Sequence, residues 1–379
     1  MAKTQRLAFV LPNLSGGGAA RVASILCGEW IKAGHEVHLI TYEEPGAAAV
    51  YPLDSRIRRH QIGLSVSPRG LLGFAGNNVR RVLRLRRALR GIKPTAIVAF
   101  LSEANMGAVL AGRWLGIPVL ISERNHPGHD PATRINAFLR ARLYPLASRL
   151  CVQTEDIRDW FRTNLAIEAS VIPNPVRMVA DHDDHAASGM KSGGRRRVVS
   201  LGRLEPQKGH DALLEAFASI ASEVPDWDMV IHGEGGQRAA LERQVAHLGL
   251  SNRVSLPGAT RTPMDVLRAC DLYVHPARYE GFPNAVLEAL SAGLCVVATD
   301  CPGATSEILQ GGKHGVLVPV GDTPALADAM LRTMRDESLR TQLGEKGRDA
   351  MRIYAPDIVA ARWIDEIERI GRLSDRWSN

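Results

Sequence analysis

The stretch Leu7-Ala8-Phe9-Val10-Leu11-Pro12-Asn13-Leu14-Ser15-Gly16-Gly17-Gly18 decides the fold. It starts with an apolar run of strand length and ends in a glycine loop. A helical stretch continues to Trp30, and a second strand-like run covers 37–41. Strand, glycine loop, helix and strand in this order predict a βαβ unit with parallel strands.

The same rhythm recurs along the whole chain. Further strands are expected at 96–100, 119–122 and 150–153, and again at 197–201, 228–232, 253–256, 272–275, 295–298 and 315–318. This alternation predicts an α/β protein with two parallel sheets covered by helices. The length of 379 residues also exceeds that of a domain built around a single hydrophobic core.

Two Rossmann-like domains and a joining segment are therefore expected. The first domain spans 1–178, a polar connection spans 179–196, and the second domain spans 197–355. Residues 356–379 are expected to form a final helix, after the break at Tyr354-Ala355-Pro356.

The composition is that of an ordinary globular protein, with 45% hydrophobic and 23% charged residues. The five cysteines are scattered and lack a C-x-x-C spacing, which favours reduced core residues in the cytoplasm. We predict neither a secretory signal nor a membrane-spanning helix, because no apolar run reaches about 18 residues.

Charge is distributed unevenly. Residues 1–180 carry 24 Lys/Arg and 12 Asp/Glu, or +12, and the remainder carries 23 and 28, or −5, which together give +7. Seven of the cations lie between 77 and 93, interleaved with an apolar stripe expected to pack inward. Such a face suits an anionic membrane surface. Nucleic acid is not expected as a partner, because stacking aromatics are scarce nearby.

The segment Tyr279–Gly293 carries the chemistry. It places Glu280 in a loop and Glu288, eight residues later, inside an apolar helix, with Pro283 expected at the first helical position. A carboxylate in apolar surroundings needs polar donors. The N–H groups of Phe282 and Asn284 at the helix start add further donors. Carboxylates and peptide donors together suit the hydroxyls of a sugar.

The segment Gly202–Gly209 follows the first strand of the second half and carries Arg203 and Lys208. Ligands of parallel sheets bind beyond the carboxyl ends of the strands. Two cations at that edge suit a diphosphate. Because they offset phosphate charge, we expect neither a metal nor a cofactor.

Two glycine loops mark further approach points, at Gly17 and Gly18 and at Gly233. A dinucleotide-binding dehydrogenase would require a third glycine in each loop. Arg21 and Arg238 occupy those positions. The D-x-D sequence Asp226–Asp228 comes at the wrong end of its strand for a metal site.

Polar residues follow two strands of the first half. They are Glu103, and the run Glu123, Arg124, Asn125 and His126. We expect Glu103, Glu123 and Arg124 on the acceptor side of the site.

These motifs resemble those of the retaining nucleotide-sugar glycosyltransferases of family four, which have the GT-B fold. The resemblance rests on two glutamates separated by seven residues, on the wording Tyr-Glu-Gly-Phe-Pro-Asn at 279–284, and on Gly202-Arg203-Leu204 with Lys208-Gly209. It implies two facing Rossmann-like domains with the donor in the cleft, and a last helix crossing back to the first domain.

The resemblance also implies roles. Glu280 and the backbone after it hold the donor hexose, Glu288 holds the ribose, and Ser306 near Gly303 contacts phosphate. The histidine that many members place against the donor sugar corresponds to either Asn125 or His126.

Ser-Glu-Arg-Asn at 122–125 together with the 279–284 wording is similar to bacterial transferases that add N-acetylhexosamines to polyprenyl-linked oligosaccharides. The resemblance therefore implies a UDP-sugar donor, a glycan or polyprenyl-linked acceptor, and a place on the cytoplasmic face of the membrane. A nucleotide-sugar epimerase and a non-catalytic sugar-nucleotide binder remain the alternatives.

Overall fold

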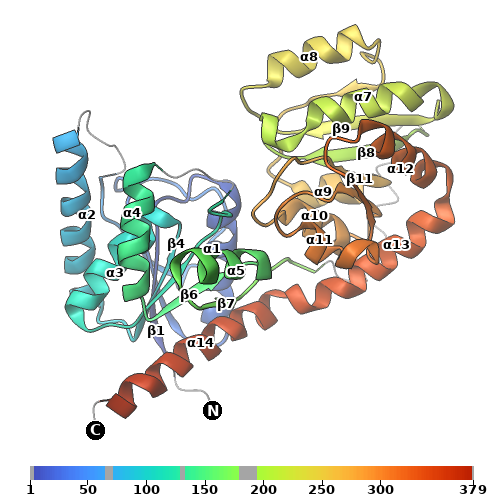
Figure 1. Cartoon of the computed structure of the whole chain (residues 1–379). Coiled ribbons are helices and arrows are strands. Elements are labelled where there is room, and N and C mark those ends of the chain that lie inside the picture. The colour runs from blue at the N-terminus through green and yellow to red at the C-terminus, as the bar shows by residue number, and fades with distance from the viewer. Residues whose placement is uncertain (1–3, 65–70, 129–132, 179–193, 378–379) are drawn as a thin grey trace. The chain divides into compact units, whose positions relative to one another are not determined.

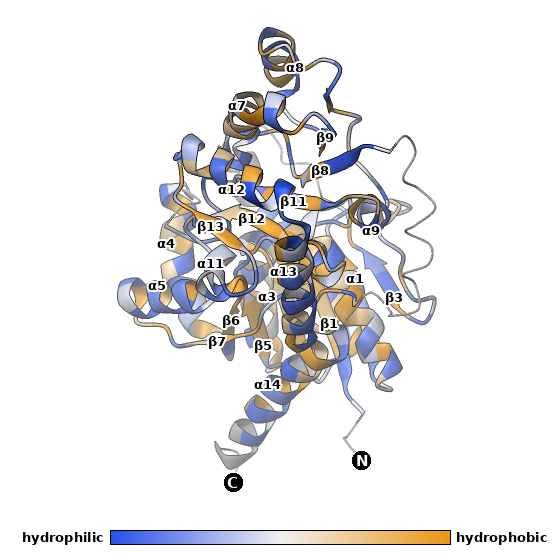
Figure 2. Cartoon of the chain, turned by 90° about the vertical axis from the view of Figure 1, so that its right-hand side faces the viewer, coloured by the Kyte–Doolittle hydropathy of each residue, from blue (hydrophilic) through white to orange (hydrophobic). Residues whose placement is uncertain are grey.

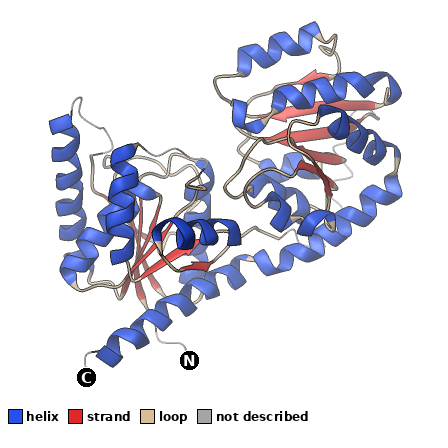
Figure 3. Cartoon of the chain, in the orientation of Figure 1, coloured by secondary structure: helices blue, strands red, loops and turns tan. Residues whose placement is uncertain are grey.

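The computed structural model describes residues 4–64, 71–128, 133–178 and 194–377. The chain divides into two compact units, Met1–Pro175 with Pro356–Asn379, and Val176–Ala355. Each unit is a parallel sheet flanked by helices (Figures 1 and 3). The two-sheet α/β architecture is therefore confirmed. Most of the predicted connection, 179–193, lies outside the described residues.

The first unit holds a seven-stranded sheet in the order β3-β2-β1-β4-β5-β6-β7. Its strands are β1 (Arg6–Leu11), β2 (Glu36–Thr41), β3 (Arg58–Gln61), β4 (Ala96–Phe100), β5 (Val119–Ser122), β6 (Arg149–Val152) and β7 (Ala169–Val171). Its helices are α1 (Gly17–Lys32), α2 (Leu71–Ile92), α3 (Ser102–Leu115), α4 (Arg134–Leu143), α5 (Glu155–Leu165) and α14 (Pro356–Trp377).

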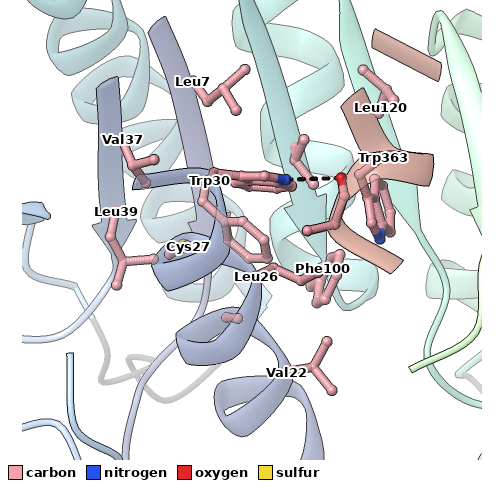
Figure 4. Close-up of a cluster of buried hydrophobic side chains, with 14 of the residues drawn as sticks. Leu7, Val22, Leu26, Cys27, Trp30, Val37, Leu39, Phe100, Leu120 and Trp363 are labelled. Carbon is pink, nitrogen blue, oxygen red and sulfur yellow. Dashed lines mark hydrogen bonds between the residues drawn. The ribbon is translucent and has the colours of Figure 1, made fainter. Parts of the chain in front are cut away.

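Alternate residues of β1 pack on opposite faces of this sheet, as strand geometry requires. Phe9 faces α1 and α14, and Val10 faces α2 and α3. On the first face, the Trp30 Nε1–H donates to the Ala360 carbonyl at 3.2 Å, and Trp363 packs beside Phe100 (Figure 4). This burial attaches α14, the last helix of the chain, to the first unit.

Two strands were not predicted, and both are edge strands. The sequence of β3 is Arg-Arg-His-Gln, which is blue in Figure 2, and no residue of β7 is fully buried. An edge strand exposes one side to solvent and need not carry the apolar run of a central strand. The central strands agree with the predicted ranges to within one residue at most ends.

The second unit holds a six-stranded sheet in the order β10-β9-β8-β11-β12-β13. Its strands are β8 (Arg196–Leu201), β9 (Trp227–His232), β10 (Val254–Ser255), β11 (Leu272–His275), β12 (Val296–Thr299) and β13 (Val316–Val318). Its helices are α7 (His210–Ile220), α8 (Arg238–His247), α9 (Pro263–Arg268), α10 (Asn284–Ser291), α11 (Thr305–Ile308), α12 (Thr323–Arg335) and α13 (Glu337–Ala350).

This sheet also buries both faces. Residues 198, 229, 231, 272, 274 and 297 pack with α7, α8 and α12, and residues 199, 201, 273, 296 and 298 pack with α9 and α10. The carboxyl ends of β8, β9, β11 and β12 consequently meet at one edge, where the loops carry the predicted site.

The five cysteines form no disulfide. Burial raises the pKa of the Cys270 and Cys295 thiols to about 12, and that of Cys27 and Cys151 further. They behave as small core residues, as expected.

Candidate active site

Glycines bring the backbone loops of the second unit into direct contact at the carboxyl edge of its sheet. A Cβ on Gly233, after β9, would overlap the Gly202 carbonyl after β8, and one on Gly209 would overlap the Pro276 carbonyl. Gly303, with φ +120°, lies against the Glu280 carbonyl in the same way. Side chains at these positions would push the loops apart, so the glycines determine how closely the site is built.

Glu280 is at the centre of this edge and is buried. Its N–H donates to the Pro302 carbonyl at 2.9 Å, and the Ala304 N–H donates to the Gly281 carbonyl at 3.2 Å. The loop after β12 therefore holds the backbone of the loop after β11, and the Glu280 carboxylate has a defined position.

The Glu280 carboxylate forms an ion pair with Lys208, whose Nζ contacts Oε1. His275 Nε2 lies 3.2 Å from the same oxygen. Burial by itself would raise the pKa of Glu280, but the approach of His275 and the charge of Lys208 outweigh it and lower the pKa to about 2. Glu280 is consequently an anion at any physiological pH.

Tyr273 continues this arrangement beneath Glu280. Its hydroxyl lies 3.4 Å from His275 Nδ1, and its ring is fully buried. Burial and the nearby charges of Glu288 and Glu280 raise its pKa well above the ordinary value, so the phenol keeps its proton. The Tyr273 hydroxyl and the Glu280 carboxylate therefore contact the two different nitrogens of the His275 ring.

The loop that carries Lys208 is joined to the loop that carries Glu280. The Gln207 side-chain amide donates to the Tyr279 carbonyl at 2.9 Å, and the Arg278 N–H donates to the Gln207 carbonyl at 2.8 Å. The Arg278 guanidinium also binds both carboxylate oxygens of Asp211 on α7, at 2.9 and 2.7 Å. These bonds place Lys208 beside Glu280.

Arg203 has a different environment. Its side chain is exposed, and one guanidinium nitrogen donates to Gln207 Oε1 at 3.3 Å. The structure thus brings Lys208 and Glu280 together and leaves Arg203 at the rim of the same loop, facing solvent.

Glu288 lies on α10, as predicted, and its side chain is buried. The helix begins at Asn284, and Pro283 precedes it as the N-cap residue with ψ 82°. The prediction that Pro283 is the first helical residue is wrong by one position. The reason is local: the Asn284 N–H bonds to the Phe282 carbonyl at 3.0 Å in a tight turn before the helix starts.

Phe282 can offer a ligand only its backbone. Its ring is buried and packs against Tyr354, with ring centroids 6.3 Å apart. Ser306, on the short helix α11 after the Gly303 turn, is half-buried at the same edge of the sheet.

In the first unit, Gly16 and Gly17 begin α1 with positive φ, and nothing lies within 4 Å of an added Cβ at Gly16 or Gly17. Gly18 continues the helix. Buried Glu43 accepts a hydrogen bond from the Leu14 N–H at 3.0 Å. Glu43 therefore holds the segment that leads into the glycine loop. This hydrogen bond gives the acidic residue after β2 a structural role, so its presence does not imply that a dinucleotide ribose binds there.

The predicted acceptor-side residues are largely engaged within the first unit. Glu123 is buried and accepts from Ser102 at 3.0 Å and from the Tyr144 hydroxyl at 2.9 Å. Arg124 is buried, bonds to Asn174, and lies over the Phe100 ring at 4.2 Å. Glu103 is ion-paired with Arg81 and is partly exposed.

Asn125 and His126 differ in accessibility. His126 is buried, with Nδ1 accepting from the Gly128 N–H at 3.1 Å and Nε2 lying 3.3 Å from Asp156. Asn125 is exposed. Of the two, Asn125 presents its side chain to solvent at the end of β5.

Metal ligands do not cluster in the described residues, where no group of three His, Cys, Asp or Glu could hold an ion. Asp228 lies at the amino end of β9 and is ion-paired with Arg195 and Arg253, away from the site edge. The segment His182-Asp183-Asp184-His185 of the polar connection has side chains of metal-ligand type, and it lies outside the described residues.

Sequence reasoning missed Tyr273, His275 and His210. Residues 273 and 275 lie on the same face of β11, and a histidine at the end of a buried strand was the available signal. His210 begins α7 and is buried, and this burial together with the neighbouring His275 and Lys208 lowers its pKa to about 4.

The basic helix α2 differs from its predicted form. Arg81 is buried: its Nε donates to the Leu64 carbonyl, and it pairs with Glu103, so it does not join the exposed cations. Val79 and Leu83 are exposed, at 59% and 47%, whereas Leu85 and Leu89 are buried. The apolar stripe expected to pack inward is therefore split between core and surface. Within the described chain no helix is long and apolar enough to cross a bilayer.

A chain of two parallel-sheet units, with Lys208, Glu280 and Glu288 at the carboxyl edge of the second sheet, has the architecture of the GT-B sugar transferases. Residues 16–178 match Glycosyltransferase Family 4, and residues 181–350 match Glycosyl transferases group 1. The chain belongs to this retaining group of GT-B glycosyltransferases.

Three curated relatives place the chain within this group. It is 24% identical over 368 residues to the N-acetylgalactosamine-N,N'-diacetylbacillosaminyl-diphospho-undecaprenol 4-alpha-N-acetylgalactosaminyltransferase of Campylobacter jejuni, which covers 92% of this chain and 96% of the relative. It is 32% identical to the phosphatidyl-myo-inositol mannosyltransferase of Mycobacterium tuberculosis, over 63% of this chain and 64% of the relative. An exopolysaccharide phosphotransferase of Streptomyces coelicolor is 30% identical over 74% of this chain, which spans 29% of that protein's length.

Solved structures agree on the fold. Anabaena HepE, determined in complex with UDP, superimposes with a TM-score of 0.77 at 19% identity, covering 96% of this chain and all of HepE. This similarity confirms the GT-B fold.

Proposed function

We propose that this protein transfers a hexosyl group, favoured as N-acetylhexosaminyl, from a UDP-sugar to a hydroxyl of a glycan or polyprenyl-linked acceptor, with retention at the anomeric carbon. The observation that carries the proposal is the buried Glu280 anion, held by Lys208 and His275 and followed eight residues later by buried Glu288. A buried acceptor of this kind is suited to sugar hydroxyls.

Glu280 acts as an acceptor of hydrogen bonds in this proposal, and not as a covalent nucleophile. Its Oε1 oxygen is engaged by Lys208 and lies 3.2 Å from His275 Nε2, which favours a positioning role for this carboxylate. It orients the hexose, and Glu288 holds the ribose hydroxyls.

Lys208 and Arg203 bind the diphosphate. Lys208 contacts both the Glu280 carboxylate and the backbone of Gly202, over which its aliphatic stem lies. A donor diphosphate would add further oxygens around the same ammonium, and the exposed Arg203 would approach from the rim. Cations placed at a leaving diphosphate stabilise its developing charge, so no metal is required.

In this proposal Gly233 and Ser306 contact the nucleoside diphosphate at the edge of the second sheet, and Pro283 and Asn284 shape the turn around the hexose. Gly17 and Gly18 are the phosphate approach points of the first unit. On the acceptor side, Asn125 is favoured over His126 for the position facing the donor sugar, because its side chain is exposed. Glu103 is the accessible acceptor-side acid, and buried Glu123 and Arg124 support the loop beneath Asn125.

Two relatives support the donor and acceptor choice. HepE was solved with UDP, and the Campylobacter relative is named for transfer of N-acetylgalactosamine to a diphospho-undecaprenol-linked sugar. The mycobacterial relative is a mannosyltransferase acting on a phosphatidylinositol. The Campylobacter and mycobacterial relatives are both named for acceptors that carry a lipid, whereas the sugars that they transfer differ.

The exposed face of α2 and α3 supports attachment to a membrane. Val79, Leu83, Leu110 and Trp114 are between 41% and 60% exposed and line an apolar groove with a volume of about 560 Å³. The Arg86 guanidinium lies 4.0 Å from the Trp114 ring centre. Apolar side chains surrounded by arginines suit an interface of anionic headgroups and acyl chains on the cytoplasmic face.

The test has two steps. A thermal-shift panel of UDP, GDP, ADP and their sugars identifies the nucleotide, because a ligand at 100 times its dissociation constant stabilises by about 2.7 kcal/mol. The preferred sugar is then incubated with a polyprenyl-diphosphate-linked acceptor. A glycosylated acceptor supports the proposal, sugar interconversion without acceptor identifies an epimerase, and binding without either reaction identifies a non-catalytic binder.

A further inference from the structure

A basic pocket lies in the first unit at the opposite edge of the sheet from its glycine loop. It has a volume of about 810 Å³, within the range of small-molecule sites. The amino-terminal halves of β1 and β2 and the length of β3 form its floor, and the carboxyl-terminal half of α2 forms its wall. The glycine loop follows the carboxyl end of β1, so this pocket is separate from any donor contact there.

Four arginines line the pocket: Arg6 on β1, Arg58 on β3, and Arg84 and Arg87 on α2. Glu36 is the one acid among the described lining residues, and it pairs with Arg6 at 2.6 Å and Arg58 at 2.7 Å. One carboxylate against four guanidinium groups leaves a net charge of +3 before any histidine is counted.

Two of the four arginines are held by backbone carbonyls. Arg6 donates to the carbonyl of Ile92 at the end of α2, at 3.2 Å, and Arg84 donates to the Ile62 carbonyl at 2.8 Å. Carbonyls position a guanidinium without neutralising it. The cations therefore remain available to an anion, and the forked guanidinium geometry matches the oxygens of a phosphate group.

Two histidines complete the floor. His38 and His60 stack with ring centroids 5.1 Å apart, and His38 Nδ1 lies 2.9 Å from His60 Nε2. His38 Nε2 lies 3.1 Å from Glu36 Oε1. If His38 donates from Nε2 to Glu36, its Nδ1 accepts from His60, and His60 Nδ1 is the nitrogen that takes the next proton.

We propose that this pocket is a second anion site, which binds a phosphate-bearing polyanion such as a diphosphate or a phosphomonoester headgroup. Four arginines and one acid supply the charge, and the volume admits more than one phosphate. The proposal does not depend on the identity of the sugar donor, because none of its residues belongs to the second unit.

Protons are linked to binding at this pocket. Burial, His38 and Arg58 lower the pKa of His60, which is therefore neutral near pH 7 in the free protein. A bound anion would face His60 together with Arg6, His38, Glu36, Arg58, Arg84 and Arg87, and would favour the imidazolium. Reciprocity then requires that affinity increase as the pH falls.

The experiment measures inorganic pyrophosphate binding to the full chain by calorimetry, with saturating UDP present to occupy the donor site. We expect binding that Arg87→Gln and Arg84→Gln each weaken by tenfold or more. The matched control is Arg90→Gln, which removes the same charge from an exposed position of the same helix outside the pocket, and it should change affinity by less than twofold. Thermal melts check that each variant is folded.

A second measurement compares pH 7.5 with pH 6.0. The wild type should bind pyrophosphate several-fold more tightly at pH 6.0, and His60→Gln should remove most of that gain. Pyrophosphate binding that saturating UDP abolishes, or that Arg90→Gln weakens as much as Arg87→Gln, would overturn the proposal.

The source of the phosphate is separated with vesicles. If a headgroup is the ligand, phosphatidate vesicles should bind the protein, pyrophosphate should displace it, and Arg87→Gln should weaken attachment. If a soluble polyanion is the ligand, pyrophosphate should bind while vesicle attachment ignores Arg87→Gln. If the protein binds neither pyrophosphate nor phosphatidate vesicles, the proposal of a second anion site is wrong.

Discussion

Lys208 and Glu280 form a partly buried ion pair although they lie 72 positions apart in the sequence. One follows β8 and the other follows β11, which are neighbours in the sheet. Because His275 at the end of β11 approaches the same carboxylate oxygen, three side chains from two neighbouring strand–loop segments meet at the centre of the site.

Lys208→Ala is expected to weaken UDP more than UMP, by about tenfold to a hundredfold, since a charged hydrogen bond contributes about 1.5 to 3 kcal/mol. Arg203→Ala should act in the same direction. Calorimetry with both nucleotides measures the difference, and exposed Lys313→Ala is the control. Equal losses for UDP and UMP would show that neither cation binds the terminal phosphate.

Glu288→Ala is expected to weaken UDP itself, because the ribose hydroxyls lose their acceptor. Glu280→Gln should leave UDP affinity within a few-fold and lower turnover much more, because it alters only the hexose contacts. Exposed Glu345→Ala serves as the control. The division of roles fails if calorimetry with UDP finds the same loss for both variants.

The stability of the protein should depend on His210 between pH 6.5 and 4. Its folded-state pKa is about 4 against 6.5 ordinarily, so the unfolded chain binds more protons in this window. The free energy of unfolding should therefore fall as the pH is lowered through it, by up to about 3 kcal/mol. His210→Leu should flatten this pH dependence in denaturant titrations.

Two comparisons isolate that effect. Exposed His247→Gln should leave the pH dependence unchanged. Glu280 does not interfere, because a carboxylate with a lowered pKa stabilises the folded protein above 4.5 and loses that contribution only as the pH falls toward 2. A His210→Leu profile parallel to the wild type would refute the assignment.

Transfer activity should survive EDTA, because Lys208 and Arg203 supply the positive charge at the leaving diphosphate. The measurement is acceptor glycosylation after dialysis against the chelator, with and without added manganese. Activity that disappears with EDTA and returns with manganese would contradict the metal-free proposal.

Membrane attachment is expected to depend on both the charge and the apolar groove of the α2 and α3 face. Arg80→Glu with Arg90→Glu should release the protein from anionic vesicles, since each surface cation contributes about 1 kcal/mol, and salt should weaken attachment. Val79→Ser with Trp114→Ser should do so even at low salt. All four positions lie outside the proposed polyanion pocket.

Sedimentation with vesicles measures this attachment, and UDP affinity should stay unchanged in every variant. Arg243→Glu with Lys313→Glu, on exposed positions of the second unit, is the matched charge control. Attachment that ignores salt and all four substitutions would mean that the face is not a membrane surface.

Much of the fold could be predicted from local pattern. Central strands such as β4 and β5 are apolar along their whole length because both faces are buried, and their predicted and observed bounds coincide. The edge strands β3 and β7 escaped prediction because partial exposure removes that pattern. The glycine loops and the Glu280–Glu288 spacing were visible because each depends on a few consecutive residues.

The sequence by itself determined two parallel sheets, the edge at which their loops gather, and the candidate residues on those loops. Only the tertiary structure decided that Lys208 meets Glu280, that His275 and Tyr273 support that carboxylate, and that Arg81 is buried while Val79 is exposed. The physical reason is that local periodicity reports burial along one element. Which side chains meet across elements depends on strand order and on how helices pack, and neither is encoded in the spacing of a single segment.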